Sequence, residues 1–146
     1  MQLPNNSVVL VADGRKSLFF RNEGDGEFPS LSIEDKAEFA NPAHNEQASD
    51  LAGQSSRTKD GHGGSMEEVD FHRQEEDRFA AELAATLKKR ALANEFEALL
   101  IAAPPRTLGE LRKHYHKEVA RRIIGELSKD LVNLPVSEIE KALREA

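Results

Sequence analysis

Short apolar runs separated by turn-forming residues fill the first part of the chain. The run "SVVLVADG" (7–14) is rich in β-branched residues and ends in Asp13-Gly14, a dipeptide suited to a tight turn. The run "SLFFRN" (17–22) fits a returning strand, and 31–39 begins with alternating apolar and polar positions. Together these patterns predict three antiparallel strands.

The apolar spacing changes to a helical period after residue 70. Phe79, Leu83 and Leu87 recur every four residues and predict one apolar stripe along a helix. Acidic residues precede this stripe and basic residues follow it, which suits the helix macrodipole at both ends. The charged residues are Glu67, Glu68, Asp70, Glu75, Glu76 and Asp77 before the stripe, and Lys88, Lys89 and Arg90 after it.

A second apolar run lies in the C-terminal third. "ALLIAAPP" (98–105) is continuously apolar and ends in two prolines, which is typical of a central strand covered on both faces. Thr107 and Glu110 then have the spacing of a capping box, which predicts a short helix to about His116.

The segment 121–146 is predicted to form a final strand and a final helix. We assign 121–131 to the strand, although Val119, Ile123, Leu127 and Leu131 also fit a helical stripe. Pro135 opens the final helix, with Ser137 and Glu140 as another possible capping box. The order β-β-β-loop-α-β-α-β-α predicts an α/β fold with a five-stranded mixed sheet and helices packed on its faces.

The stretch 40–70 separates the two halves. Its only large aliphatic residues are Leu51, Met66 and Val69, so it buries too little apolar surface to order itself. We predict a long flexible loop at about 40–70 within a single domain spanning 1–146. In the simplest interpretation its end is a flexible entry to the helix, with Ser65 as the N-cap and Glu68 completing a capping box.

Composition narrows the class of protein. The chain has 146 residues, no cysteine and a formal net charge of −6. Its length suits one domain, and the missing cysteines exclude disulfides and thiolate metal sites. Neither a signal peptide nor an apolar run of membrane length is recognisable, so we expect a cytoplasmic protein with no membrane contact. The negative charge disfavours general affinity for nucleic acid, but not a local basic face.

Such a face is predicted in 106–122. Six basic residues against two glutamates give this segment a local net charge of +4, with His114, Tyr115 and His116 between them. Positive charge beside a stacking ring is what phosphate backbones and unpaired bases select, although a solvated helix face would look the same. The candidate RNA-binding residues are Arg106, Arg112, Lys113, His116, Lys117, Arg121 and Arg122.

Metal and cofactor chemistry finds little support. The five histidines form no H-E-x-x-H motif or other spacing that places two ring nitrogens on one helical face. Asp13 follows the first strand, where α/β sheets often hold functional carboxylates, but Asp13-Gly14 is better explained by the turn. We expect no metal site and no cofactor.

Three blocks resemble a known family. "VVLVADGRKSLFF", "GGSMEEVDFHRQEEDRFAAELAATL" and "LLIAAPPRTLGELRKHYHKEV" are similar to the bacterial host attachment proteins, named for a requirement in attachment to host cells. That family resembles the central domain of archaeal and eukaryotic peptide chain release factors, an α/β domain with a strand, a glycine-rich loop and a long helix in succession. In release factors the loop carries a Gly-Gly-Gln motif that enters the ribosomal peptidyl transferase centre.

The resemblance carries over only in part. Gly63 and Gly64 match the two glycines, but Ser65 stands where the catalytic glutamine would be, and Gln54 follows a single glycine. A water held against an ester carbonyl needs that amide in a fixed place, so peptidyl-tRNA hydrolysis is not expected. The candidate loop contacts are Gln54, His62, Gly63, Gly64 and Ser65.

Two functions follow. We favour a non-enzymatic module of the host attachment family that contacts RNA or the ribosome, with a host-interaction component as a further possible partner. The alternative is a hydrolase acting on an ester or phosphodiester, with the glycine-rich loop as an active-site lid and Ser65 or Gln54 in the chemistry. The sequence does not fix the oligomeric state.

Overall fold

A five-stranded mixed sheet forms the centre of the protein. The computed structural model describes residues 2–38 and 64–146, with side chains in the second range described from Phe71 onward. The strands are β1 (Val8–Ala12), β2 (Lys16–Asn22), β3 (Leu31–Glu38), β4 (Leu99–Ala102) and β5 (Ile123–Leu127). In the order β3-β2-β1-β4-β5, the pairs β1/β2 and β2/β3 are antiparallel, whereas β1/β4 and β4/β5 are parallel.

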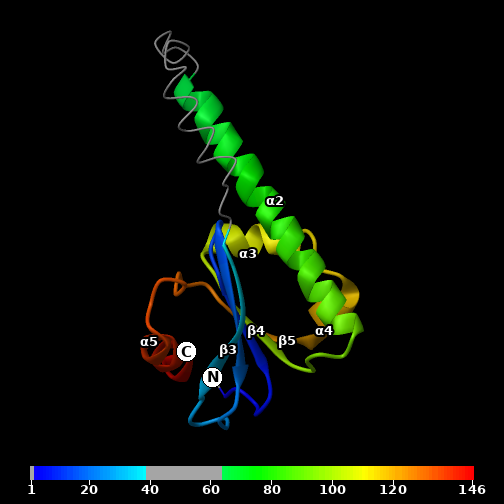
Figure 1. The fold of residues 1–146 in the computed structure, drawn as a ribbon, viewed down its shortest axis with the longest axis vertical. Helices are drawn as coiled ribbons and strands as arrows, with labels where there is room; N and C mark the ends of the chain where they lie inside the picture. The colour runs from blue at the N-terminus through cyan, green and yellow to red at the C-terminus, as the bar shows by residue number, and fades with distance from the viewer. Residues whose placement is uncertain (1, 39–63) are drawn as a thin grey trace.

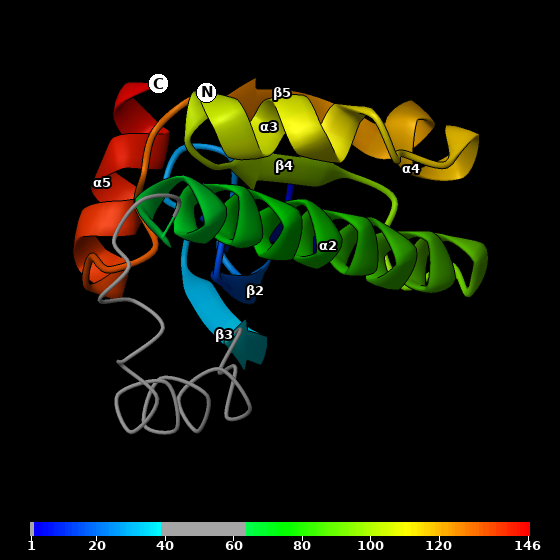
Figure 2. The same cartoon turned by 90° about the horizontal axis from the view of Figure 1, so that it is seen from above.

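Helices cover both faces of this sheet. They are α2 (Gly64–Leu92), α3 (Pro105–Arg112), α4 (Lys117–Arg122) and α5 (Val136–Glu145). Figures 1 and 2 show α2, α3 and α4 on one face and α5 on the opposite face. The predicted α/β fold, with its five-stranded mixed sheet, is therefore confirmed.

Each face of the sheet has its own apolar core. On one face Phe79, Leu83 and Leu87 of α2 pack with Leu10 and Ile101 of the strands. The predicted stripe is therefore the buried face of the helix. Its spacing of four residues returns each side chain to the same side of α2.

The opposite face is closed by α5. Ile139 and Leu143 pack with Val9, Val11 and Leu100, side chains that alternate in direction with those of the first core. All residues of β1 and β4 are buried, because both strands are covered on their two faces. This double burial explains the continuous apolar run predicted as a central strand.

The final strand is shorter than predicted. β5 covers only 123–127 of the expected 121–131, and Arg121 and Arg122 end α4 instead. β4, its one neighbour in the sheet, contributes four residues, and the last pair is Ala102 with Leu127. The N–H of Ala103, just after β4, donates to the carbonyl oxygen of Leu127, and among the described residues no strand pairs with the chain that follows.

Neither predicted capping box in the C-terminal third forms. The N-caps of α3 and α5 are Pro104 and Pro135, and neither helix start has a side-chain cap. Thr107 lies inside α3. Glu140 instead accepts a hydrogen bond from the N–H of Leu31 at 2.8 Å, which ties α5 to the edge strand β3.

The helix predicted to reach about His116 ends four residues earlier, and a separate helix follows it. α3 ends at Arg112, and the N–H groups of Lys113 and His114 bond to carbonyls only three residues back, as in a tightened last turn. His116 has an extended backbone, and its Nδ1 accepts from the N–H of Glu118 at 3.1 Å to begin α4. His116 is thus the N-cap of α4.

The predicted loop is also shorter than expected. Residues 64–70 are helical, so Ser65 is the second residue of α2 and not its N-cap. The acidic residues of this segment interact favourably with the positive end of the helix macrodipole. This stabilises the first turns of α2, although the segment has little apolar surface to bury. The rest of the loop, 40–63, lies outside the described residues.

An ion-pair network joins the edge strand to α2. Glu34 of β3 accepts from Arg21 Nε at 2.9 Å and from Arg90 Nη2 at 2.7 Å. The Arg90 guanidinium also lies 4.8 Å from the ring centre of Phe19. Burial alone would raise the pKa of Glu34, but the hydrogen bonds and charges of the two arginines outweigh it and lower the pKa.

We predict that this network makes stability depend on pH. Because its folded-state pKa is lowered, Glu34 stabilises the fold above its unfolded pKa of about 4.3, and this contribution disappears as pH falls through the folded value. Glu34→Gln should therefore cost about 1 kcal/mol at pH 7 and nothing at low pH. Urea unfolding of both proteins across pH 2–7 measures the difference, and a constant difference would contradict the assignment.

Candidate nucleic-acid interface

The described part of the candidate loop lies at the start of α2. Gly64 and Ser65 are its first two residues. Gln54, His62 and Gly63 lie outside the described residues. The structure therefore places the end of the glycine-rich segment directly at a helix start, in the strand, loop and helix order that the resemblance implied.

α2 is much longer than its packed part. Figure 1 shows its first turns extending beyond the sheet. Among the described side chains of α2, Phe79 is the first buried one. The helix from Gly64 to Arg78, which we call the α2 arm, is about 22 Å long at 1.5 Å per residue, and its base meets α3 where Glu76 lies 3.7 Å from Arg106.

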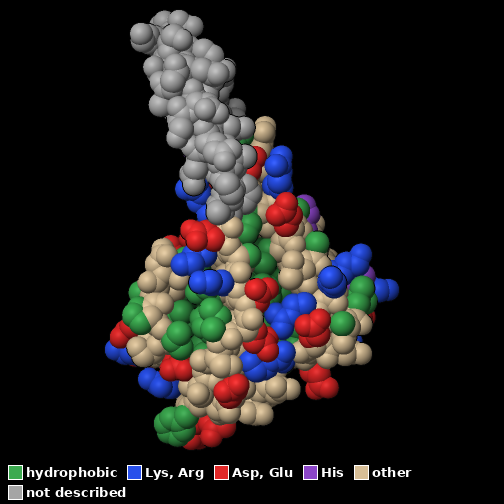
Figure 3. Space-filling model, viewed as in Figure 1, with side chains coloured by type: hydrophobic (Ala, Val, Ile, Leu, Met, Phe, Trp, Pro, Cys, Tyr) green, Lys and Arg blue, Asp and Glu red, His purple; other side chains and the backbone are tan. Residues whose placement is uncertain are grey.

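The predicted basic face lies on α3, α4 and the turn between them. Figure 3 shows Lys and Arg side chains over α2 and α4, with Asp and Glu side chains between them. The side chains of Arg112, Lys113 and Arg121 are 57%, 66% and 65% exposed, so their charged groups reach solvent. Lys117 is also exposed.

These exposed cations have carboxylate partners nearby. The distances are 2.9 Å for Arg112–Glu126, 2.9 Å for Lys113–Glu110, 2.8 Å for Arg121–Glu118 and 3.7 Å for Arg106–Glu76. Exposed pairs of this kind contribute about 0–1 kcal/mol each, so phosphate groups can replace the carboxylates at small cost. The face is a mosaic of both signs, less positive than its Lys and Arg content alone indicates.

The pairing also affects protonation. Hydrogen bonds with Glu126 and Glu110 raise the pKa of Arg112 and of Lys113 respectively. A hydrogen bond from Arg121 is the main cause that lowers the pKa of Glu118. These directions favour the charged forms of Arg112, Lys113 and Glu118.

Arg122 does not belong to the exposed face. The residue is only 8% exposed, and its guanidinium donates to the carbonyl oxygen of Phe96 at 2.6 Å and to Asn94 Oδ1 at 3.0 Å. Glu118 lies 3.5 Å away. These contacts fasten α4 to the turn that follows α2, so Arg122 has a structural role.

The aromatic and imidazole side chains of this segment are likewise engaged. The Tyr115 ring packs against the core below α2, and its hydroxyl donates to Glu126 Oε2 at 3.2 Å. Burial, followed by the Glu126 charge, raises its pKa well above the usual range. Tyr115 therefore offers no free ring for base stacking. His116 is half-buried and its Nδ1 is occupied by the cap of α4.

Two further cations, not among the predicted RNA contacts, lie near α4. Lys88 and Lys89 are exposed in the last turns of α2 and were assigned only to the helix macrodipole. Figure 2 shows the end of α2 beside α4, so these lysines lie at the same end as Lys117 and Arg121. The pairing of helices brings them there, and no local pattern in the sequence indicates it.

The described residues contain neither a candidate metal cluster nor a membrane-spanning helix. Within residues 2–38 and 64–146 no three His, Asp or Glu side chains come together as a metal site would require. In the same part of the chain, no helix has the length and apolar character needed to cross a membrane.

Comparison with known proteins identifies the family. The model of bacterial archaeo-eukaryotic release factor family 12 matches residues 6–143, nearly the whole chain. The protein belongs to this family, and the predicted relation to release factors is confirmed. No curated protein matches the chain significantly.

Proposed function

We propose that this member of release factor family 12 is a non-enzymatic module that binds RNA, with the ribosome as the assembly that presents it. The observation that carries the proposal is the α2 arm, which holds Gly64 about 22 Å from the packed part of the helix. An arm of this length suits a domain that reaches into a recess of a large partner while its body stays outside.

Charge at the other end of α2 supports the same proposal. Arg112, Lys113, Lys117 and Arg121 expose their side chains beside the packed end of the helix, near Lys88 and Lys89. RNA backbones bind such cations chiefly through phosphate contacts and counterion release. Two contact regions, one at each end of α2, would fix the direction of the arm relative to the RNA.

The Gly-Gly-Gln motif of release factors is incomplete beside Gly63-Gly64. Ser65 follows Gly63-Gly64 in place of a glutamine, so no side-chain amide stands there to position a water. A relation to the host attachment proteins, proposed from the sequence blocks, fits a binding role equally well. The hydrolase alternative is therefore best treated as an outcome of the test.

Neutralising the exposed cations should weaken RNA binding. We predict that Arg112→Gln, Lys113→Gln and Arg121→Gln combined reduce ribosome co-sedimentation at least tenfold and lower the salt dependence, because up to three phosphate contacts are lost. Binding is measured at several salt concentrations with purified ribosomes and with structured RNA.

A matched variant on the opposite side of the molecule provides the control. Lys129, Lys141 and Arg144 are exposed near or on α5, and replacing all three by Gln changes the net charge equally. This control should bind nearly as well as the natural protein. Equal losses in both triple variants would reject the proposed face. Hydrolysis of a peptidyl-tRNA ester that disappears in Ser65→Ala would instead favour the enzyme.

A further inference from the structure

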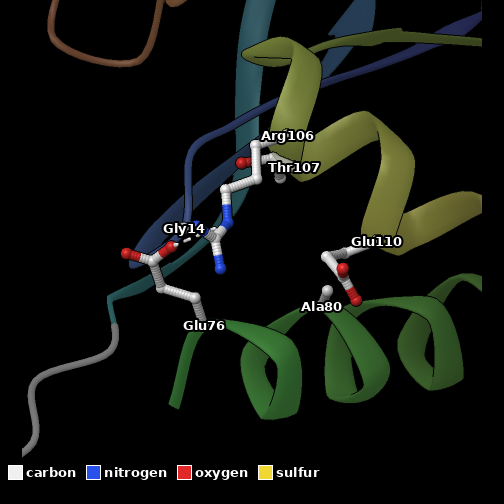
Figure 4. Close-up of a pocket in the computed structure, with 6 residues that line it drawn as sticks. All are labelled: Gly14, Glu76, Ala80, Arg106, Thr107 and Glu110. Carbon is white, nitrogen blue, oxygen red and sulfur yellow. Dashed lines mark ion pairs between the residues drawn. The ribbon is translucent and has the colours of Figure 1, made fainter. Parts of the chain in front are cut away.

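A small pocket lies at the carboxyl ends of the parallel strands β1 and β4. It sits between the turn after β1, the α2 arm and the start of α3 (Figure 4). Its volume is about 10 Å³, enough for a water molecule or one oxygen atom of a larger group. The lining residues are Gly14, Glu76, Ala80, Arg106, Thr107 and Glu110.

One wall of the pocket is made of hydrogen-bond donors. α3 begins with Pro105, and no side chain caps this end, so the N–H groups of Arg106 and Thr107 have no partner within the helix. The positive end of the helix macrodipole adds to them. The Arg106 side chain, 49% exposed, carries a guanidinium at the rim.

The side chain of Thr107 adds a further hydrogen-bond donor to the pocket. The residue is 92% buried and lines the pocket, yet its hydroxyl has no hydrogen-bond partner among the described residues. Its oxygen is not one of the fully buried atoms without a partner, which belong to Ser17, Asp77 and Arg122, so the hydroxyl still meets solvent in the pocket. A ligand oxygen in the pocket would accept from this hydroxyl in place of that solvent.

An internal carboxylate already occupies the mouth of the site. Glu76 on the α2 arm extends over Gly14, where even a Cβ atom would lie 2.8 Å from its Cδ, and its Oε2 lies 3.7 Å from Arg106 Nε. Figure 4 shows the Glu76 and Arg106 side chains meeting across the opening. The Glu76 side chain is 35% exposed and can turn outward to solvent.

The other charges around the pocket nearly balance. Glu110 also lines it, but Lys113 lies 2.9 Å from its carboxylate and lowers its pKa chiefly through their hydrogen bond. Asp77 lies behind, next to Glu110 and Lys113, with one carboxylate oxygen buried and without a hydrogen-bond partner. With Glu76 turned away, Arg106 and Lys113 face Glu110 and Asp77, so an anion meets no net repulsion.

The geometry points to a binding site for a terminal phosphate group, with Glu76 as its internal competitor. One phosphate oxygen would enter the pocket and accept from Thr107 Oγ1 and the first N–H groups of α3, while the others stay at the rim with Arg106. A terminal phosphate fits better than a backbone phosphodiester, because the narrow opening lies between two helices and a turn. Arg106 and Lys113 belong to the predicted basic face, but the pocket itself does not depend on the proposal that this face binds RNA.

Amide chemical shifts in the full chain test this site. Titration with inorganic phosphate should shift the amides of Gly14, Arg106 and Thr107, whereas chloride at matched ionic strength should not. A nucleoside 5′-monophosphate and the same nucleoside without phosphate distinguish a nucleotide source from free phosphate. A comparison of RNA carrying a 5′-phosphate with RNA carrying a 5′-hydroxyl tests whether the phosphate comes from an RNA end.

The variants should change the affinity for phosphate in opposite directions. Glu76→Gln should tighten phosphate binding about tenfold because it removes the competing charge, whereas Thr107→Val and Arg106→Gln should each weaken it about tenfold. Lys141→Gln, an equal charge change on the exposed side of α5, should leave it within about twofold. Thermal unfolding checks that the variants fold. No phosphate-specific shift in the natural protein, or no gain in Glu76→Gln, would overturn the proposal.

Discussion

Ile101→Ala is expected to destabilise the protein by about 2–5 kcal/mol. Ile101 is completely buried at the centre of β4, where its side chain enters the core below α2. Truncation removes apolar contacts and leaves a cavity that the flanking strands β1 and β5 are too constrained to close. Leu83→Ala on the facing helix, 5% exposed, should fall in the same range.

Ile124 provides the matched control for this prediction. It lies on the neighbouring strand β5, but it is 44% exposed. The same Ile→Ala change should therefore cost less than about 1 kcal/mol. Urea unfolding at 25 °C measures all three variants. Equal losses at Ile101 and Ile124 would mean that the core is not where the structure places it.

Arg122→Ala should cost about 2–4 kcal/mol, an unusual value for an arginine. The change leaves the carbonyl of Phe96 and the side chain of Asn94 without their donor, and it removes a partner of Glu118. Asn94 holds a left-handed backbone conformation, φ 56°, at the end of α2, so its contact with Arg122 also fixes the turn into β4.

The preceding residue is the comparison for Arg122. Arg121→Ala removes an identical side chain that is 65% exposed and should change stability by less than about 0.5 kcal/mol. Arg122→Lys should recover only part of the loss, because an ammonium cannot reach two acceptors as a planar guanidinium does. A result for Arg122→Ala close to that for Arg121→Ala would reject the structural role.

Periodicity was sufficient to predict the elements that bury apolar surface. The spacing of Phe79, Leu83 and Leu87 identified the packed face of α2, and the unbroken run around Ile101 identified β4. In both cases one local pattern has one physical explanation, the burial of a stripe or of two sheet faces. The fold class followed from the order of these elements.

Helix boundaries were less predictable because several local signals compete there. Thr107 and Glu110 have the spacing of a capping box, but Pro105 has a backbone already suited to a first turn, so α3 starts three residues earlier than a cap at Thr107 would give. His116 was considered as an RNA contact, although it caps α4 through Nδ1. Histidine is an uncommon cap, so no local signal indicated that a separate helix begins at Lys117.

The candidate site was the least predictable part, because its character depends on residues that are distant in the sequence. Arg121 and Arg122 are adjacent residues of the same type. The carbonyl of Phe96, far earlier in the chain, nevertheless holds Arg122 in the interior. Tyr115 similarly meets Glu126 on β5. The charge of the sequence segment gives the correct number of cations. It does not indicate which of them the fold pairs with carboxylates or buries.

The α2 arm has a mechanical consequence. Its packed half is held by the core, while about 22 Å of helix extends to Gly64, so the helix acts as a lever with its fulcrum near Phe79. A tilt of about 5° at the fulcrum would carry the tip about 2 Å, which is within the range of ordinary helix shifts. Glu76 lies close to the fulcrum, so losing its contact with Arg106 would be amplified at the tip.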